Sequence, residues 1–188
     1  GEIRIGGRAA GPTGPAGRRA LGLAIVPEDR RTEGLALDLS LAENLLLDAG
    51  ALGGPAWGTR APGALRRAAA PRLERFGVTA DPGTRAGALS GGNQQRVVLA
   101  RELRVPPTAL LLVNPTRGLD LRAAAFVRDE VRRLRDAGAG VLLVSTDLDE
   151  VVELADRVVV LSRGRLAGPF AKGTQRAELG RAMAGGAP

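Results

Sequence analysis

The sequence contains no cysteine and no histidine. Without cysteine the chain can form neither a disulfide nor a thiolate nucleophile. Without histidine it lacks the side chain that most often serves as a general base and as a metal ligand. Zinc sites of the usual Cys/His type and Ser-His-Asp catalysis are therefore excluded.

Aromatic residues are also scarce, at 2% of the chain, although the net charge is +7. Lys172 is the only lysine among 27 basic residues, so arginine supplies nearly all of the positive charge. An arginine-rich surface can bind nucleic acid, because guanidinium groups contact phosphates. Against that interpretation, the arginines are spread along the chain, often beside acids, and side chains that stack on bases are nearly absent. We expect no nucleic-acid partner.

Long apolar runs are missing too, since none approaches the roughly eighteen residues that a membrane-spanning helix requires. No signal-peptide pattern opens the chain, and its start at Gly1 is typical of an internal fragment. With 188 residues, of which 44% are apolar, the chain can bury a sizeable core. We expect a cytoplasmic protein, which can still dock on a membrane protein.

The second half of the chain alternates between strand and helix patterns. Apolar runs at 109–113, 141–145 and 157–161 have the length of buried strands, and helical patterns at 122–136 and 148–155 separate them. This alternation predicts an α/β fold with a parallel sheet and right-handed crossovers.

The first half is expected to contribute two short strands, 2–5 and 23–26, joined by a Gly/Pro loop over 11–20. Ser40 and Glu43 form a capping-box pattern at the start of an all-helical segment. The remaining expected elements are helices over 39–47, 64–76 and 91–103, a mobile low-complexity loop over 49–63, a hairpin that pairs 157–161 with 165–168, and a terminal helix over 174–183.

Ligands of an α/β sheet bind at the carboxyl ends of its strands. Those ends are VPEDR (26–30), VNPTRGLD (113–120) and VSTDLDE (144–150). Their order is that of a P-loop nucleotide hydrolase, in which a G-x-x-x-x-G-K-[ST] loop holds phosphate. The nearest candidate, GPTGPAGRR, has the wrong spacing and no lysine, and its prolines remove amide donors. We interpret it as a connecting loop.

The strongest signal is LSGGNQQR, at 89–96. Ser90, Gly91 and Gly92 stand at a predicted helix start, where a hydroxyl, open backbone amides and the helix dipole can bind a terminal phosphate. The alternative is structural, with Ser90 as an N-cap and the glycines allowing close packing. SGG alone would favour that alternative, but the same chain also supplies NPTRGLD and VLLVSTDLDEV.

Together, LSGGNQQR, PTRGLD, STDLDE and ADRVVVLSRGRL resemble the nucleotide-binding domain of an ABC transporter ATPase, from residue 2 to about 168. VPEDR is similar to the Q-loop variant in the second half of tandem sugar-type importer ATPases, and the purine-nucleoside type is the most similar. The resemblance implies a P-loop NTPase core with a helical signature subdomain. It divides the chain into core strands with the Q-loop region (1–38), the helical signature subdomain (39–104), the Walker B, D-loop and H-loop strands (105–170) and a C-terminal tail (171–188).

The departures from this pattern concern the domain's own ATP site. The resemblance implies a Walker A strand and loop upstream of Gly1, so the fold is expected to be truncated at its N-terminus. The Walker B Asp falls on Val113, the catalytic Glu on Asn114, the Q-loop Gln on Glu28 and the switch His on Thr146. Val113 cannot hold Mg²⁺, and Asn114 cannot accept a proton from water. We therefore expect no metal site and no ATP hydrolysis by this chain alone.

Each replacement also has a structural interpretation. Val113 can continue the buried strand, Thr146 or Asp147 can cap the next helix, and Glu28 with Asp29 can form a solvated turn.

The signature and the D-loop, by contrast, are intact. In the ABC family two domains pack head to tail, and each ATP lies between the Walker motifs of one domain and the signature of the other. The resemblance implies that this chain contacts ATP and Mg²⁺ bound mainly by a partner domain fused upstream. The residues implied are Ser90, Gly91, Gly92, Asn93 and Asp120. It also implies permease subunits that contact segment 30–47 at the cytoplasmic face of the membrane.

Two other functions stay open: a catalytically silent regulatory or structural ABC module, and a soluble ABC protein that acts on nucleic acid. The preferred function is import of a simple sugar or a purine nucleoside. In related sheets the Walker A strand lies between the strands that match 141–145 and 157–161. We therefore predict that these two are not hydrogen-bonded neighbours, and that the unpaired edges leave the chain marginally stable.

Overall fold

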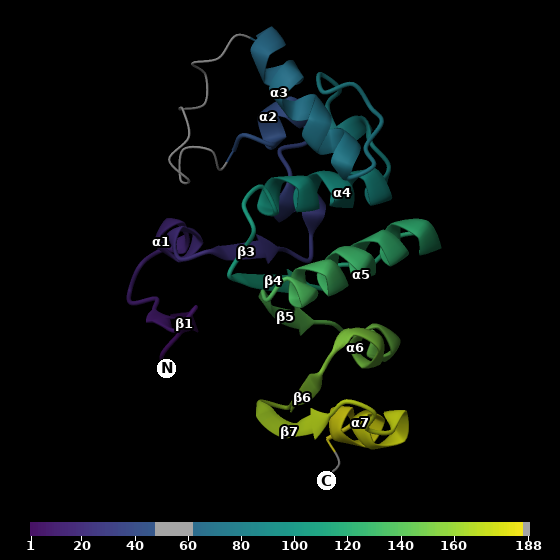
Figure 1. Ribbon diagram of the computed structural model, residues 1–188. Helices are drawn as coiled ribbons and strands as arrows, with labels where there is room; N and C mark the ends of the chain where they lie inside the picture. Colours follow the sequence, from purple (N-terminus) through teal and green to yellow (C-terminus); the bar gives the residue numbers. More distant parts are fainter. Residues whose placement is uncertain (48–61, 186–188) are drawn as a thin grey trace. The chain divides into compact units, whose positions relative to one another are not determined.

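The computed structural model describes residues 1–47 and 62–185 (Figure 1). Clustering of contacts divides the chain into two compact units, Gly1–Leu142 and Leu143–Pro188. Each unit is described by itself.

A three-stranded sheet with the order β3-β4-β5 runs through the first unit. β3 (Leu23–Val26) pairs in parallel with β4 (Ala109–Val113), and β5 (Gly140–Val144) lies on the other side of β4. Leu23 is opposite Ala109 and Val26 is opposite Leu112. Alternate side chains of β3 and β4 are buried, because successive residues of a strand point to opposite faces. The predicted α/β class is therefore confirmed.

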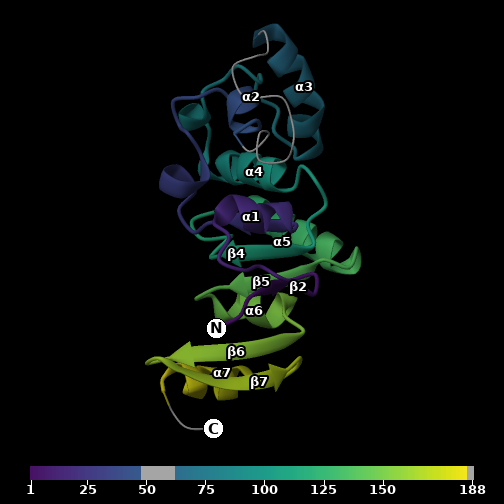
Figure 2. The same ribbon diagram turned by 90° about the vertical axis from the view of Figure 1, so that its left-hand side faces the viewer.

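Helix α4 (Gly91–Glu102) is surrounded by other elements of this unit. It contacts β3, α2 (Leu41–Asn44), α3 (Pro62–Arg75) and α5 (Leu121–Asp136). Figures 1 and 2 show it between the pair α2 and α3 and the sheet. Every residue from Val97 to Ala100 is buried, more than the single apolar stripe of a surface helix, because α4 is covered on several sides.

Helix α1 (Pro15–Ala20) corrects the prediction of a Gly/Pro loop over 11–20. Pro15 stands in the first turn of this helix, where its missing N–H has no helical partner in any case and its fixed φ suits the helix. The sequence analysis took this proline as a loop residue. The helix precedes β3, the strand whose carboxyl end carries VPEDR.

The N-terminal strand expected over 2–5 is the first half of a small hairpin. β1 (Arg4–Ile5) pairs antiparallel with β2 (Arg8–Ala9), which was not predicted. The turn between them uses Gly6 and Gly7, both with positive φ, a backbone conformation that glycine adopts without strain.

Helices α3, α4 and α5 occur near their expected bounds, whereas α2 is shorter than the helix expected over 39–47, since residues 45–47 form a turn. The capping box of α2 is confirmed, because the Glu43 amide donates to Ser40 Oγ (3.2 Å) and the Ser40 amide to Glu43 Oε2 (2.8 Å). Two short turns were not predicted: the π-helical turn η1 (Arg30–Gly34) and the 3-10 turn η2 (Ala86–Ala88). The loop expected over 49–63 lies outside the described residues, except that Pro62 and Gly63 begin α3.

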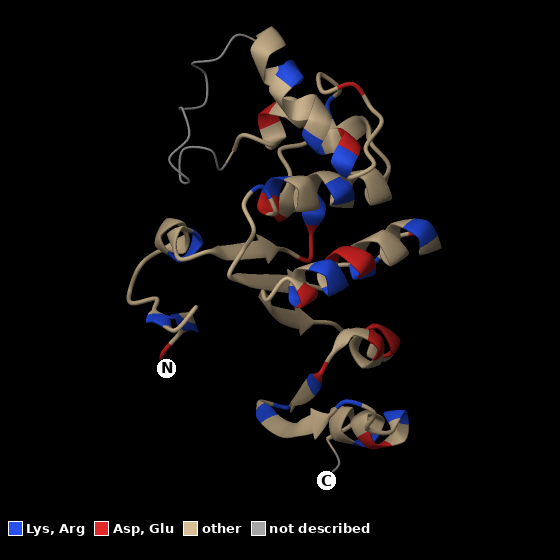
Figure 3. Ribbon diagram, viewed as in Figure 1, with Lys and Arg blue, Asp and Glu red and all other residues tan. Residues whose placement is uncertain are grey.

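The surface of α5 carries charges of both signs (Figure 3). Arg132 pairs with Asp129 at 2.8 Å and Arg133 with Glu130 at 2.7 Å, both three residues apart on the helix. Such mixed pairs are typical of a solvated helix face. Much of the arginine of this helix is therefore neutralised locally.

The second unit contains α6 (Leu148–Leu154), the hairpin of β6 (Arg157–Ser162) and β7 (Arg165–Ala171), and α7 (Arg176–Met183). The hairpin and the terminal helix occur as predicted. Their common core is small and consists of Val160, Phe170, Leu179 and Ala182.

The prediction about the strands at 141–145 and 157–161 is confirmed. Within the described residues β6 pairs with β7 alone, whereas β5 belongs to the three-stranded sheet. Across residues 1–47 and 62–185, no helix has both the length and the apolar character that crossing a membrane demands.

Candidate functional site

The start of α4 carries several polar groups whose protons are not donated to any other residue in the described part of the chain. Ser90 is the N-cap and its hydroxyl oxygen accepts from the Asn93 amide at 3.4 Å. That bond uses a lone pair, so the hydroxyl proton remains available to donate. In the described part of the chain, the amides of Gly91 and Gly92 make no hydrogen bond, as is usual for the first turn of a helix. Exposed donors at the positive end of a helix can bind an anion.

The start of α5 lies beside this group. Asp120 is the N-cap of α5 and accepts from the Ala123 amide at 2.8 Å. A Cβ added at Gly92 would lie 2.9 Å from Ala123 Cβ and 3.6 Å from Asp120 Oδ2. Gly92 therefore permits the close approach of the two helix starts, and the structural alternative of an N-cap with close packing holds for Ser90 and Gly92. The structure thus places Gly92 of the signature beside Asp120.

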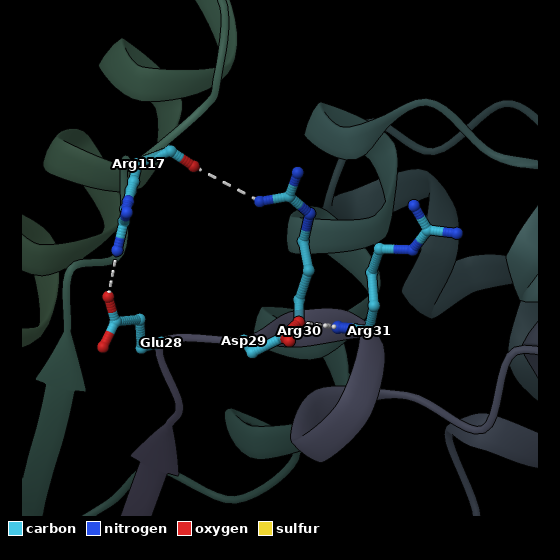
Figure 4. Close-up of a pocket in the computed structure, with 5 residues that line it drawn as sticks. All are labelled: Glu28, Asp29, Arg30, Arg31 and Arg117. Carbon is cyan, nitrogen blue, oxygen red and sulfur yellow. Dashed lines mark hydrogen bonds and ion pairs between the residues drawn. The ribbon is translucent and has the colours of Figure 1, made fainter.

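The segment after β3 forms an open pocket of about 420 Å³ with the loop after β4 (Figure 4). Glu28 forms an ion pair with Arg117, and both side chains are exposed. Arg30 Nη1 donates to the Arg117 carbonyl oxygen at 3.3 Å. Asp29 and Arg31 complete the lining. The pocket therefore joins VPEDR to NPTRGLD, although Glu28 and Arg117 are 89 residues apart in the sequence.

Asp29 caps the turn η1. Its carboxylate accepts from the amides of Arg31 (2.8 Å) and Thr32 (3.3 Å). The Thr32 side chain and the Arg31 amide, which bond to the charged form, hold the pKa of Asp29 below its ordinary value. Glu28 and Asp29 are both exposed, as the interpretation of a solvated turn requires, but each also has a specific partner.

The strand end at Val113 and Asn114 has no carboxylate. Val113 is the last residue of β4 and is half-buried, and Asn114 follows with a φ of 43°. The Asn114 carbonyl accepts from the Arg117 amide at 3.1 Å. Among the described residues, no group of three or more Asp, Glu, His or Cys side chains is placed to hold a metal ion. Because proteins usually hold Mg²⁺ through one or two carboxylates, the side chains of this strand end fit it poorly.

Thr146 lies in the second unit and is exposed. The neighbouring Asp147 is the N-cap of α6, because its carboxylate accepts from the amides of Asp149 (2.9 Å) and Glu150 (3.3 Å). Of the two residues considered as caps, Asp147 therefore has this role.

Sequence reasoning missed Arg30 and Arg117 as site residues. Both belong to segments that were recognised as strand ends. Their contacts, however, join segments 87 and 89 residues apart, and no local pattern announces such pairs.

Comparison with known proteins finds close relatives, although no family model matches the chain. The arabinose import ATP-binding protein AraG 2 of Burkholderia thailandensis is 41% identical over 173 residues, which cover 92% of this chain and 33% of that protein. The guanosine import ATP-binding protein NupO of Bacillus subtilis is 39% identical over 172 residues, which cover 87% of this chain and 33% of that protein. The chain thus spans about a third of the length of the curated relatives it matches.

Two solved structures have a similar fold. One is the ADP conformation of MJ1267, an ATP-binding cassette of an ABC transporter, with a TM-score of 0.68, 19% identity, and coverage of 94% of this chain and 70% of that chain. The other is a dimeric ATP-binding cassette, MJ0796, bound to ADP and Pi, with a TM-score of 0.69, 22% identity, and coverage of 91% and 74%. At these identities the likeness concerns the fold alone.

Proposed function

We propose, from its homology with sugar and nucleoside import ATP-binding proteins and its ABC ATPase fold, that this chain is the C-terminal half of a tandem importer ATPase. It supplies the LSGGN signature to an ATP site whose other half belongs to a partner domain. Relatives are named for import of arabinose, ribose and guanosine, so we propose a simple sugar or a purine nucleoside as the solute. Its place is the cytoplasmic face of the membrane, on permease subunits.

The observation that carries this proposal is the contrast between two parts of one unit. The start of α4 offers the Ser90 hydroxyl and the open amides of Gly91 and Gly92. The strand end at Val113 and Asn114 offers no carboxylate. The hydroxyl and the two amides lie together at the positive end of a helix, which favours an anion, in the same unit as a strand end without a carboxylate.

The residues of this chain then have defined tasks. The Ser90 hydroxyl and the two glycine amides donate to the terminal phosphate of an ATP held by the partner, and the dipole of α4 favours its negative charge. The backbone amide of Asn93 donates to the Ser90 hydroxyl oxygen and so fixes the Ser90 side chain. Asp120 holds the start of α5 beside them. The ATP and its Mg²⁺, when bound, supply the phosphoanhydride and the Lewis acid.

On its own side the domain is expected to be silent. Val113 offers no oxygen for Mg²⁺, and the Asn114 amide does not act as a base at neutral pH. Glu28 is engaged by Arg117. Thr146 lacks the ring nitrogens that the switch His of the family has at this position.

Substitution of Ser90 tests the proposal in the assembled transporter. Ser90→Arg places a bulky side chain at the start of α4, and we expect ATP hydrolysis to fall by roughly a hundredfold or more, as when a preorganised donor is lost. Asn114→Ala is the matched control, because it alters the silent side, and its rate should stay within about twofold of wild type. An unchanged rate in Ser90→Arg would instead identify a regulatory or structural module.

A further inference from the structure

The first residue of α4 is covered by a side chain from the segment after β3. A Cβ added at Gly91 would lie 2.5 Å from Arg30 Nη2, 3.2 Å from Cζ and 3.5 Å from Nε. Three atoms of one guanidinium are thus the nearest neighbours of that position. The Arg30 guanidinium occupies the space that a side chain at position 91 would need.

The same guanidinium also contacts the loop that leads to α5. Arg30 Nη1 donates to the Arg117 carbonyl oxygen at 3.3 Å, as Figure 4 shows. Arg117 stands three residues before Asp120, the N-cap of α5. A guanidinium is planar and holds its donors in a fixed fork. One side chain therefore contacts both the start of α4 and the loop before α5.

In the described part of the chain Arg30 forms no ion pair, although its charge contributes to lowering the pKa of the neighbouring Asp29. Glu28 pairs with Arg117, and the Asp29 carboxylate caps η1. Arg30 Nε is buried and makes no hydrogen bond there. Burying part of a charged group without an ion pair costs free energy. An arginine kept only for solubility would extend into water, as its neighbour Arg31 does.

We propose that Arg30 is a positioning residue for the ATP site described above. Its guanidinium holds the Gly91 end of α4 and the Arg117 carbonyl in register, so that Ser90 and Asp120 face the same nucleotide. Arg30 acts through these backbone groups. This inference rests on the proposed function.

Arg31 provides a matched control. It is the next residue, it lines the same pocket, and its side chain is exposed. Only its backbone amide has a recorded bond in the described structure, to Asp29. Arg31→Ala therefore removes the same charge from the same turn without touching α4 or the loop before α5.

The first experiment measures steady-state ATP hydrolysis by the assembled transporter. In Arg30→Ala we expect kcat to fall about tenfold while KM for ATP changes less than about twofold, since the partner domain holds most of the nucleotide. Arg30→Lys keeps the charge but not the planar fork, so it should recover only part of the rate. Arg31→Ala should match wild type. Full recovery in Arg30→Lys, or an equal loss in Arg31→Ala, would overturn the positioning role in favour of net charge.

The second experiment is a double-mutant cycle with Gly91→Ala. A methyl group at position 91 displaces the Arg30 guanidinium, so Arg30→Ala should add nothing once Gly91→Ala is present. If the fold-loss of rate in the double variant equals the product of the losses in the two single variants, the residues act independently, which would contradict the inference. All variants should keep a thermal midpoint within about 2 °C of wild type, which separates misplacement from unfolding.

The Ser90→Arg result separates the two proposals. If Ser90→Arg leaves the rate unchanged, the proposed function fails and the role of Arg30 fails with it. If Ser90→Arg abolishes hydrolysis while Arg30→Ala behaves as Arg31→Ala does, only the role of Arg30 is wrong.

Discussion

Glu102, at the end of α4, accepts hydrogen bonds from several elements of the first unit. Its carboxylate is fully buried and accepts from Arg19 Nη1 at 2.7 Å, from Arg101 Nη2 at 2.9 Å and from the Ile25 amide at 3.3 Å. These donors come from α1, α4 and β3. One carboxylate therefore fixes the far end of the signature helix to the strand that leads into VPEDR.

Glu102→Ala is expected to lower the free energy of unfolding by about 3–5 kcal/mol, because it removes a buried carboxylate that accepts from two guanidinium groups and a backbone amide. Urea denaturation of the chain measures this loss. Glu28→Ala is the comparison, because it breaks the exposed pair with Arg117 and should cost about 1 kcal/mol or less. Equal losses in the two variants would show that burial does not set the strength of these pairs.

At the residue scale, the sequence predicted the groups whose role depends on position along the chain. Ser90, Gly92 and Asp120 stand at helix starts, and helix starts have a local pattern. Arg30 and Glu102 were missed because their partners are distant in sequence and become neighbours only after the sheet and α4 pack. The roles proposed for all of these residues in ATP binding stay predictions.

The short helix α2 depends on its cap. It has four residues, Leu41–Asn44, too few to be stable by propensity. Glu43 accepts hydrogen bonds from the Ser40 hydroxyl (2.6 Å) and the Ser40 amide (2.8 Å). These two bonds favour the charged carboxylate and hold the pKa of Glu43 below its ordinary value of 4.5.

Glu43→Gln is therefore expected to destabilise the chain near neutral pH but not in acid. Because the folded-state pKa is depressed, the charged form contributes stability above the ordinary pKa, and that contribution is lost as pH falls through the folded value. Urea denaturation should show a difference of about 1 kcal/mol near pH 7 that shrinks as the pH falls below 4.5 and through the folded-state pKa. A difference that persists in acid would mean that Glu43 stabilises α2 by shape and not by charge.

Elements with a strong local period were predicted best. β4 occupies 109–113 as expected, because a buried parallel strand is a short apolar run ended by turn residues. The prediction of a loop over 11–20 was wrong, because proline is favoured in the first turn of a helix, as at the start of α1. η1 was missed because its closing bond, from the Gly34 amide to the Asp29 carbonyl (3.2 Å), has no sequence pattern.

At the scale of the whole molecule, the two units have cores of different size. In the first, fully buried side chains from β3, β4, α4 and α5 form the interior, among them Val26, Leu110, Leu99 and Val127. In the second, the core is the four residues that β6, β7 and α7 share. Regions with few buried apolar contacts open at lower free energy than the main core.

Hydrogen exchange should therefore distinguish the units. We expect amides of β6, β7 and α7 to exchange at least about tenfold faster than those of α4 and β4, because the smaller core opens more often. Phe170→Ala removes the largest side chain of that core and should accelerate exchange in the second unit while leaving α4 unchanged. A single cooperative opening of both units, or faster exchange in α4, would contradict this.

The family resemblance, which places a Walker A strand between them, predicted the separation of β5 from β6. The alternating pattern of the second half was enough to predict the α/β class. It did not predict that the chain divides after residue 142, because this boundary falls inside β5 and follows from how densely each part packs. The four segments expected from the family resemblance stay a prediction.

The backbone conformation of Asn114 limits which residues can replace it at this strand end. Its φ of 43° is a left-handed conformation that asparagine tolerates, whereas most side chains, glutamate included, lose roughly 1–2 kcal/mol there. Under the proposed function, a mutation to glutamate would regain a carboxylate on a backbone that opposes it, and Val113 would still leave the metal unheld. No single step on this path improves catalysis, so selection has nothing to favour along the way. The division of labour between this domain and its partner is thus hard to reverse in evolution.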